Sequence, residues 1–350
     1  MKNKTKFLGA VLFTALALVS CSDDDDATVV VGTPTPGVTA QTRLFATSNG
    51  GSSIVNYNLT DLNNITTKTF VTANLNADGV YYDAASDLAV VANRNSNSLD
   101  AYTAINVNDS GVSVVSDFSS TADMSSPREV TVNGNFYVVA DNADVDGDAN
   151  TPDGRFFIYQ KSGNSFSLRN IVTVGFKVWS GVFVGDDFYA GVDSTGDLAV
   201  FNNFLAANTV DATVAPSKRI TIEGITRTHG ITFDASTGTG IMTDIATVGV
   251  AGAEADGGFH VIADFESKVA AVADGGTLLI AGNQVRVAGS NTMLGNPVDV
   301  AFDGSTGIVY IAEAANGKIL AFSNVSAGGN LTPIVDNDLS GASSVYLSKE

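Results

Sequence analysis

From Thr42 to Glu350 the chain consists of short apolar runs of Val, Ile, Phe, Tyr, Leu and Thr, broken by Gly, Asn and Asp. No stretch of this region has convincing helical periodicity, and alternation with a period of two is typical of β-strands. The pattern therefore predicts an all-β domain over residues 42–350.

One phrase recurs along this domain. It has a Gly-Val-like start with alternating apolar residues, an Asp-Gly-type turn, a second apolar strand that ends in an acid or Asn, a polar turn and a third strand. Five copies span residues 79–102, 129–159, 181–201, 230–262 and 299–322. A partial sixth copy over residues 43–57 lacks the first strand, and residues 342–350 form an orphan strand of that type.

The orphan strand completes the partial copy, because a closed ring leaves no sheet edge open. The sequence therefore predicts a six-bladed β-propeller in which the C-terminal strand is the innermost strand of the first blade. Equivalent strand-end positions are separated by 45, 48, 52, 51 and 69 residues; they are Ser48, Asn93, Asp141, Asp193, Asp244 and Glu313. We expect residues 277–289, in the long last interval, to form an outer hairpin of the fifth blade. A cryptic seventh blade is the alternative, but few residues remain for four strands.

The repeat resembles that of NHL-type propellers and, more loosely, the six-bladed senescence-marker/gluconolactonase group. The resemblance covers nearly all of residues 42–350 and implies the fold more than an activity, because such propellers serve as lactonases, lyases, protein-docking discs and glycan binders. In the lactonase group a Glu, an Asn and an Asp hold a channel metal, and Glu313, Asn93 and the strand-end aspartates offer these residue types. The glutamate that the group carries near the start of its first blade is missing here, so the metal site does not carry over.

The strand-end acids also have a purely structural interpretation. An Asp that closes a strand accepts backbone N–H bonds across the following turn and would recur in each blade for that reason alone. We therefore interpret these residues first as turn caps.

The N-terminus carries export signals. Residues 1–20 combine three lysines with an apolar run from Phe7 to Val19, which is typical of a secretory signal and too short for a membrane span. The segment ends in Leu-Val-Ser-Cys, which resembles the bacterial lipobox and implies lipidation of Cys21, the only cysteine of the chain. Asp23–Asp26 resemble the export tag of Bacteroidetes-type surface lipoproteins, although a solvated spacer would also explain the acidic run. We interpret residues 21–41 as a flexible tether and expect a lipid-anchored protein at the outer membrane, on the cell surface.

Composition narrows the class of partner. Removal of residues 1–20 takes three of the 18 basic residues, which leaves 15 against 37 acidic residues and a net charge near −22. Such a charge repels nucleic acid and anionic lipid, and it favours cations, neutral glycans or basic partners. With Cys21 lipidated, the chain has no disulfide.

One loop has the oxygen spacing of a calcium site. Residues 142–153 place oxygen side chains at positions 1, 3, 5, 7, 9 and 12 with Gly147 at position 6, as in EF-hand-type loops. The predicted ligands are Asn142, Asp144, Asp146, Asp148, Asn150 and Asp153. Position 12 is Asp instead of the usual Glu and strands flank the loop, so an acidic turn without an ion is the alternative.

The starts of the inner strands converge on the channel mouth, where propellers usually bind. We predict the ligand-binding residues Asp78, Arg128, Glu129, Trp179, Ser180, His229 and Asp299. Trp179 would stack, Arg128 would hold an oxygen-bearing group and His229 would hydrogen-bond or act as a base. Arg128 and Glu129 could instead pair with neighbouring groups and close the channel.

Catalytic signatures are otherwise absent: the sequence has no G-x-S-x-G, no H-E-x-x-H and no phosphate loop. Three interpretations remain. We favour a binding or interaction propeller for a small molecule, glycan or protein. The others are a metal-dependent lactonase-like or lyase-like enzyme and a structural envelope lipoprotein without a ligand.

Overall fold

The computed structural model of the 350-residue chain describes residues 41–73, 76–246 and 256–350. The predicted signal segment, Cys21 and residues 21–40 of the predicted tether lie outside the described residues. No helix among the described residues is long and apolar enough to cross a membrane.

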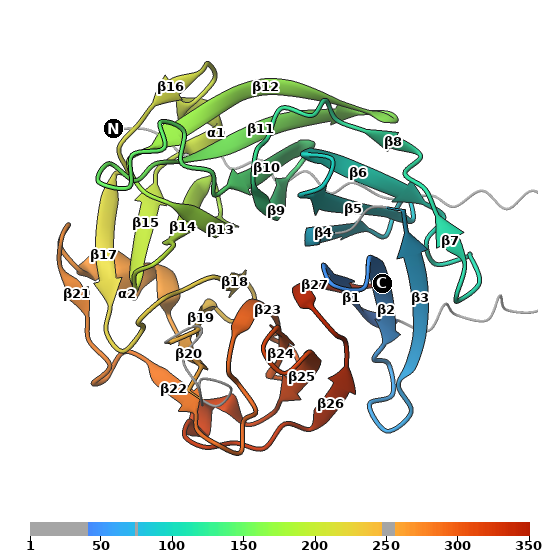
Figure 1. Cartoon of the computed structure of the whole chain (residues 1–350). Helices are drawn as coiled ribbons and strands as arrows, with labels where there is room; N and C mark the ends of the chain where they lie inside the picture. Colours follow the sequence, from blue (N-terminus) through green and yellow to red (C-terminus); the bar gives the residue numbers. More distant parts are fainter. Residues whose placement is uncertain (1–40, 74–75, 247–255) are drawn as a thin grey trace, which may run out of the picture. The chain divides into compact units, whose positions relative to one another are not determined.

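The described residues form six sheets arranged around one axis as the blades of a propeller (Figure 1). From the axis outward, the first blade contains β27 (Ala342–Lys349), β1 (Thr42–Ser48), β2 (Ser53–Asn58), β3 (Thr66–Thr72) and β7 (Ser113–Val114). The second contains β4 (Ala77–Asp83), β5 (Leu88–Asn93), β6 (Ser98–Thr103) and β8 (Phe118–Ser119). The third contains β9 (Pro127–Asn133), β10 (Phe136–Asp141), β11 (Gly154–Ser162), β12 (Ser165–Val174) and β16 (Ala212–Thr213).

In all six blades the inner four strands are antiparallel, and the short fifth strand of the first, third and fourth blades pairs in parallel. The fourth contains β13 (Val178–Val184), β14 (Asp187–Val192), β15 (Asp197–Phe201), β17 (Lys218–Ile222) and β21 (Thr277–Leu278). The fifth contains β18 (Ile231–Asp234), β19 (Thr239–Asp244), β20 (Gly258–Ile262) and β22 (Val285–Ala288). The sixth contains β23 (Pro297–Asp303), β24 (Ile308–Glu313), β25 (Lys318–Phe322) and β26 (Val335–Asp338). The predicted six-bladed fold is confirmed.

Tight turns connect the two innermost strands of a blade. In the third blade a two-residue turn follows Asn133, and Gly134 adopts a φ of 61°, in the left-handed region that favours glycine. Gly185 has the same φ of 61° between β13 and β14. A Cβ on either glycine would meet nothing within 4 Å, so the backbone conformation, and not space, requires glycine there.

The hydrophobic core lies between the blades. The described residues form six buried apolar clusters, and each joins the facing sides of two adjacent blades. One cluster packs Leu44 and Val55 of the first blade against Tyr310 and Ile319 of the sixth. Because every blade is buried on both sides, the ring must be complete before all its apolar surface leaves water.

β27 closes the ring. It pairs antiparallel with β1, with Leu347 opposite Leu44 and Val345 opposite Ala46. Beyond the strands, Gln41 and Glu350 exchange two backbone N–H bonds, at 3.0 and 2.8 Å. The predicted closure by the C-terminal strand is confirmed.

The expected hairpin over residues 277–289 is wrong in part. β22 is the outer strand of the fifth blade, as expected, but β21 pairs in parallel with β17 of the fourth blade. The two strands therefore bridge neighbouring blades and are not paired with each other. Helix α2 (Phe265–Ala271) accounts for a further part of the long interval, and it buries Phe265 and Val269 in the cluster between the fourth and fifth blades. Two other short helical turns are α1 (Phe204–Ala207) and a 3₁₀ turn at Val325–Ala327.

The closure generates the first prediction. Deletion of residues 342–350 should lower the melting temperature by more than about 10 °C or prevent folding, because β1 loses its inner partner and several kcal/mol of burial. Glu350→Gln is the control and should change little, because it keeps the two backbone bonds to Gln41 and removes only a partly exposed ion pair with Arg43. Thermal unfolding followed by circular dichroism measures both. A strand deletion that melts within about 2 °C of the full chain would contradict the proposed closure.

Candidate functional site

The strand-end residues cap backbone turns. The carboxylates of Asp141, Asp244 and Glu313 each accept at least three backbone N–H bonds at 2.8–3.3 Å, from the following turn and from the segment before the inner strand of the same blade. Asn93 accepts N–H bonds from the two nearest residues of its turn. The turn-cap interpretation of these residues is confirmed. Their oxygens therefore serve the backbone, and none of them belongs to a group of three acidic, His or Cys side chains close enough to hold a metal among the described residues.

The channel contains a cavity of about 460 Å³ between the six inner strands. Its lining begins at Glu129 and Asp299, near the strand starts, and reaches Asp234 and Lys349 at the strand ends. Between these levels the wall is mostly apolar. Five half-buried aromatic side chains line it: Tyr81, Phe183, Phe233, Phe302 and Tyr346. We call this space the central cavity.

Two acids and a serine form the floor of the central cavity. Glu129 lies on β9 and Asp299 on β23, which are on opposite sides of the axis (Figure 1). Ser344 of β27 connects them: its Oγ is 2.7 Å from Asp299 Oδ2 and 3.2 Å from Glu129 Oε2. Asp299 is 4% exposed and Ser344 is fully buried. Glu129 is half-buried, so the two carboxyl groups meet through one buried hydroxyl group at the edge of the cavity.

The hydrogen bonds of Ser344 indicate that one acid of this pair is protonated. Ser344 Oγ has one proton, and the short contact assigns it to Asp299 Oδ2. Ser344 Oγ also accepts the N–H of Val80, at 3.2 Å. Ser344 Oγ also lies within donating distance of Glu129 Oε2, at 3.2 Å, so its single proton must serve two carboxyl groups and cannot satisfy both. Burial and the nearby charge of Asp299 raise the pKa of Glu129 well above its usual value, and burial raises the pKa of Asp299 to about 6. We therefore assign the proton of the pair to Glu129 and the negative charge to Asp299.

Two glycines let the acids reach these positions. A Cβ on Gly79 of the second blade would lie 2.7 Å from the Cα of Glu129. A Cβ on Gly230 of the fifth blade would lie 2.7 Å from the Cα of Asp299. Each acid is thus set by the close approach of a bare backbone from the preceding blade.

On the strand-start side of this floor, three of the predicted ligand-binding residues stack on one another. The ring of Trp179 lies parallel to that of His229, with 3.5 Å between ring centroids, and the guanidinium carbon of Arg128 is 4.2 Å from the centroid of the Trp179 ring. Arg128 also donates to Asp78 at 3.1 Å, and Arg94 lies 3.6 Å from the same carboxylate. His229 and Arg128 cannot occupy the same face of the indole, so protein atoms cover both of its faces.

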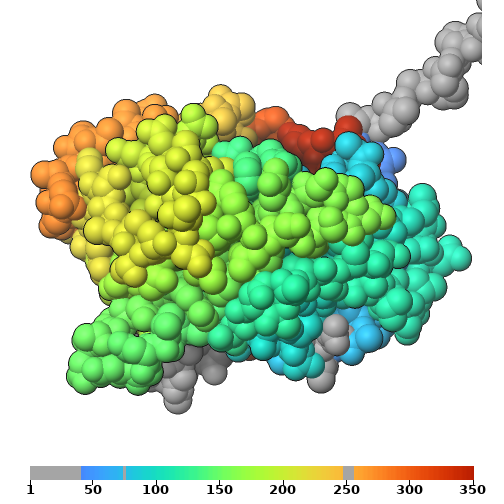
Figure 2. Space-filling model, turned by 90° about the horizontal axis from the view of Figure 1, so that it is seen from above, coloured from blue at the N-terminus to red at the C-terminus, as the bar shows by residue number. Residues whose placement is uncertain are grey.

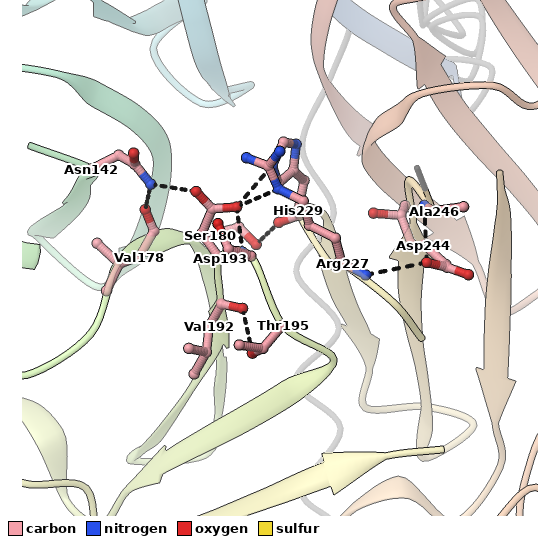
Figure 3. A network of polar contacts seen from close by, with 12 residues as sticks. Asn142, Val178, Ser180, Val192, Asp193, Thr195, Arg227, His229, Asp244 and Ala246 are labelled. Carbon is pink, nitrogen blue, oxygen red and sulfur yellow. Dashed lines mark hydrogen bonds and ion pairs between the residues drawn. The ribbon is translucent and has the colours of Figure 1, made fainter. Parts of the chain in front are cut away.

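Asp193 ties this stack to the neighbouring blades. Figure 3 shows Asp193 between the Asn142 amide on one side and Arg227 and His229 on the other. The His229 Nε2 contact is 3.2 Å, and Ser180 Oγ donates to the backbone carbonyl of His229. Burial lowers the pKa of His229 to about 4 despite the nearby carboxylate, so the ring is neutral at pH 7 and donates from Nε2. Burial raises the pKa of Asp193, but the hydrogen bonds from His229 and Arg227 outweigh this and hold it below its usual value.

The predicted calcium loop brings three of its six residues together. Carboxylate oxygens of Asp144, Asp146 and Asp153 all lie within 4.8 Å of one another. Asn142 turns away and donates to the carbonyl of Val178 and to Asp193. Asp148 accepts two bonds from Asn150, at 2.7 and 3.0 Å. In the side view the green segment around this loop projects from the body of the blades (Figure 2).

The structure thus divides the predicted binding residues into two groups. Glu129 and Asp299 line the central cavity, whereas Asp78, Arg128, Trp179, Ser180 and His229 do not. The sequence reasoning missed Ser344 as the bridge, the five aromatic wall residues, and Arg94 and Arg227 as partners of the acids. Four of the aromatic residues had a usable signal, because Tyr81, Phe183, Phe233 and Phe302 follow the first residue of their repeat copy by two or three positions.

The acid pair generates the second prediction. Unfolded carboxyl groups ionise near pH 4, whereas Glu129 keeps its proton to a much higher pH in the folded state, so its contribution to stability is lost as pH rises above about 4. The change Glu129→Gln places an N–H donor where the protonated acid has O–H. The difference in melting temperature, Glu129→Gln minus wild type, should therefore increase by at least about 3 °C from pH 5 to pH 8.

The matched control for this measurement is Glu266→Gln, which changes an exposed glutamate of α2. It should follow the wild type at every pH. Parallel melting curves for wild type and Glu129→Gln across this range would contradict the assigned proton.

Calcium binding stays a prediction, and the loop geometry sharpens its test. Millimolar calcium should stabilise the wild type by about 1–2 kcal/mol if the loop binds in the weak extracellular range. Asp144→Asn with Asp146→Asn should abolish this response, measured as a calcium-dependent shift in melting temperature. Asp148→Asn should keep it, because position 7 of such loops binds through its backbone carbonyl. Equal responses in all three proteins would mean that the loop is an acidic turn.

Comparison with known proteins supports the fold. No known protein family and no curated protein sequence matches the chain. Among solved structures, a protein of Bacteroides fragilis NCTC 9343 named as a candidate 6-phosphogluconolactonase matches with a TM-score of 0.57, 11% identity and coverage of 90% of this chain and 100% of that one. A chain of a nidogen/laminin complex matches with a TM-score of 0.56, 12% identity and 88% and 98% coverage. A protein of Lactobacillus plantarum matches with a TM-score of 0.52, 13% identity and 88% and 99% coverage. At such identities the similarity extends to the propeller fold alone.

Proposed function

We propose that this protein is a ligand-binding propeller and that the central cavity is its site. The observation that carries the proposal is the combination, in one cavity, of five aromatic wall residues with two acids bridged by a serine hydroxyl. Binding sites for small molecules are commonly cavities of roughly 300–1,000 Å³ with apolar walls and a few convergent polar groups. At about 460 Å³, the central cavity suits a small molecule or one to two sugar units.

The proposal moves the binding residues from the strand-start mouth to the central cavity. Trp179 presents no free ring face for a ligand, because Arg128 and His229 cover it. Arg128 is paired with Asp78. We assign these residues to closing one end of the channel, and Glu129 and Asp299 to ligand contact.

The proposed setting is the outer membrane, with Cys21 as the lipid anchor and the domain on the cell surface. Its support is the sequence of the export segment, which lies outside the described residues. The strongly acidic chain fits a ligand that is not nucleic acid. Calcium in the 142–153 loop would have a structural role.

A hydrolase or lyase is the second candidate, and the acid pair is the observation that favours it. Two carboxyl groups in one cavity, one protonated and one ionised, can act as general acid and general base. One structural neighbour is named as a candidate lactonase, although its similarity concerns the fold. Turnover of a lactone or glycoside that Glu129→Gln abolishes would favour this candidate over simple binding.

The binding site is tested by filling the central cavity. Thr232 of β18 lines it and is half-buried. A thermal-shift screen of metabolites and oligosaccharides should give compounds that stabilise the wild type, and Thr232→Phe should abolish their effect by placing a ring in the cavity. Thr232→Ser is the matched control and should leave binding within about twofold, since it removes one methyl group. Ligands that bind Thr232→Phe unchanged, but lose affinity with Trp179→Ala, would return the site to the strand-start mouth.

A further inference from the structure

We propose that the ligand of the central cavity is a small organic cation, an amine or quaternary ammonium group, that binds in exchange for the proton of Glu129. This inference rests on the proposed function, because it takes the central cavity as the binding site. It adds the chemical class of the ligand and a coupling between binding and proton release.

The charge of the floor is the first argument. Among the described residues, no Lys, Arg or His nitrogen lies within 4.0 Å of the carboxylates of Glu129 or Asp299. The closest basic residue in sequence, Arg128, is paired with Asp78 on the other side of the floor. An ionised Asp299 that is 4% exposed and a second acid beside it therefore lack a cationic partner. Buried charges are usually paired, so the floor has an open place for a positive charge.

The walls give the second argument. Tyr346 follows Ser344 of the floor by two positions on β27, so it lies above the floor, and Tyr81 and Phe183 line the same cavity from β4 and β13. Tyr81 and Tyr346 contact each other, with ring centroids 5.0 Å apart. Aromatic faces attract ammonium groups and most strongly quaternary ones, whereas an anion would meet both these faces and the acids. The carboxyl groups of the floor and the aromatic rings of the walls are together complementary to a cation with an apolar body.

The floor is a poor site for a metal ion. Asp299 Oδ1 accepts the N–H of Val300, its Oδ2 accepts the N–H of Val345, and Glu129 Oε1 accepts the N–H of Val130. Calcium takes roughly six to eight oxygen ligands, and these backbone donors already use much of the oxygen capacity of the pair. An ammonium group needs only acceptor lone pairs at hydrogen-bond distance, or none if it is quaternary.

The proton exchange follows from the same geometry. The ligand brings one positive charge, Glu129 gives its proton to the solvent, and the floor changes from one ionised carboxylate to two. Asp299 on β23 and Asp78 on β4 are the acids that act on Glu129, and Asp78 is already paired with Arg128 and Arg94. On β27 the neighbouring group is Ser344, and His229 on β18 belongs to the stack beyond the floor. At the rim, no ion pair joins Asp234 to another described residue, whereas Lys349 is paired with Asp303 at 2.6 Å.

Benzylamine, benzyl alcohol and benzoate test the charge, because they share one shape and differ in charge. In calorimetric titrations of the purified full-length protein, benzylamine should bind at least tenfold more tightly than the other two. Below the pKa of Glu129 its affinity should rise by about tenfold per pH unit, and one proton should be released per ligand. Titration in two buffers with different heats of ionisation measures that proton.

Variants test which residues bind benzylamine and release the proton. Glu129→Gln should remove both the pH dependence and the proton release, and Asp299→Asn should weaken benzylamine at least tenfold. Thr232→Phe should block benzylamine and Thr232→Ser should not, which keeps the test valid if either acid variant fails to fold.

The outcomes separate this inference from the proposed function. The proposal of a cationic ligand would be overturned if benzyl alcohol or benzoate bound as tightly as benzylamine, or if benzylamine bound without proton release. Calcium chloride that displaces benzylamine, with an effect lost in Glu129→Gln, would overturn it in favour of a metal. A neutral glycan that Thr232→Phe blocks, with no binding of benzylamine, would overturn the cation while the central site stands. Binding of every ligand unchanged in Thr232→Phe would instead contradict the proposed function itself.

Discussion

The pairing of β27 with β1 is the interaction on which the rest of the structure depends. It closes the ring, and closure is what lets each blade bury both of its sides against a neighbour. The same strand supplies the floor of the central cavity, because Ser344 bridges Glu129 and Asp299 and the backbone of Val345 donates to Asp299. Stability of the ring and geometry of the candidate site therefore rest on one strand.

The two ends of the channel have different chemistry. The floor holds two acids without a basic partner, and the stack beyond it holds Arg128, Trp179 and His229 with their charges paired by Asp78 and Asp193. Because the charges of the stack are satisfied within the protein, it is suited to closing the channel. The acids of the floor are hydrogen-bonded but have no basic partner among the described residues, so the floor is suited to a ligand.

Much of the fold was predictable because the repeat is local. The inner-strand start, the Asp-Gly-type turn and the capping acid recur at blade length, and each does the same work in its own blade, as Asp141 and Asp244 show. The pairing of β21 with the fourth blade was not predictable in this way. The two residues of β21 carry no sequence signal for the strand with which they pair, because the path of the chain after β20 determines which strand they reach.

The sequence predicted which residues lie near the channel better than it predicted which of them contact one another. Convergence of the inner strands correctly indicated that Arg128, Trp179 and His229 would meet, but not that they would stack on one another. The separation of Glu129 from Arg128 follows from alternation, since adjacent residues of a strand point in opposite directions. The reach of Glu129 across the axis to Ser344 depends on rotamers and on the close approach at Gly79, which a pattern of residue types does not encode.

The position of Ser344 also has a consequence for biosynthesis. β27 follows every other strand of the ring in the chain, so five inner strands are made before the residue that joins the two acids exists. A growing polypeptide thus has both carboxyl groups but no bridge between them. The cavity acquires its floor in the last step of assembly, and any ligand met earlier on the route finds no finished site to occupy.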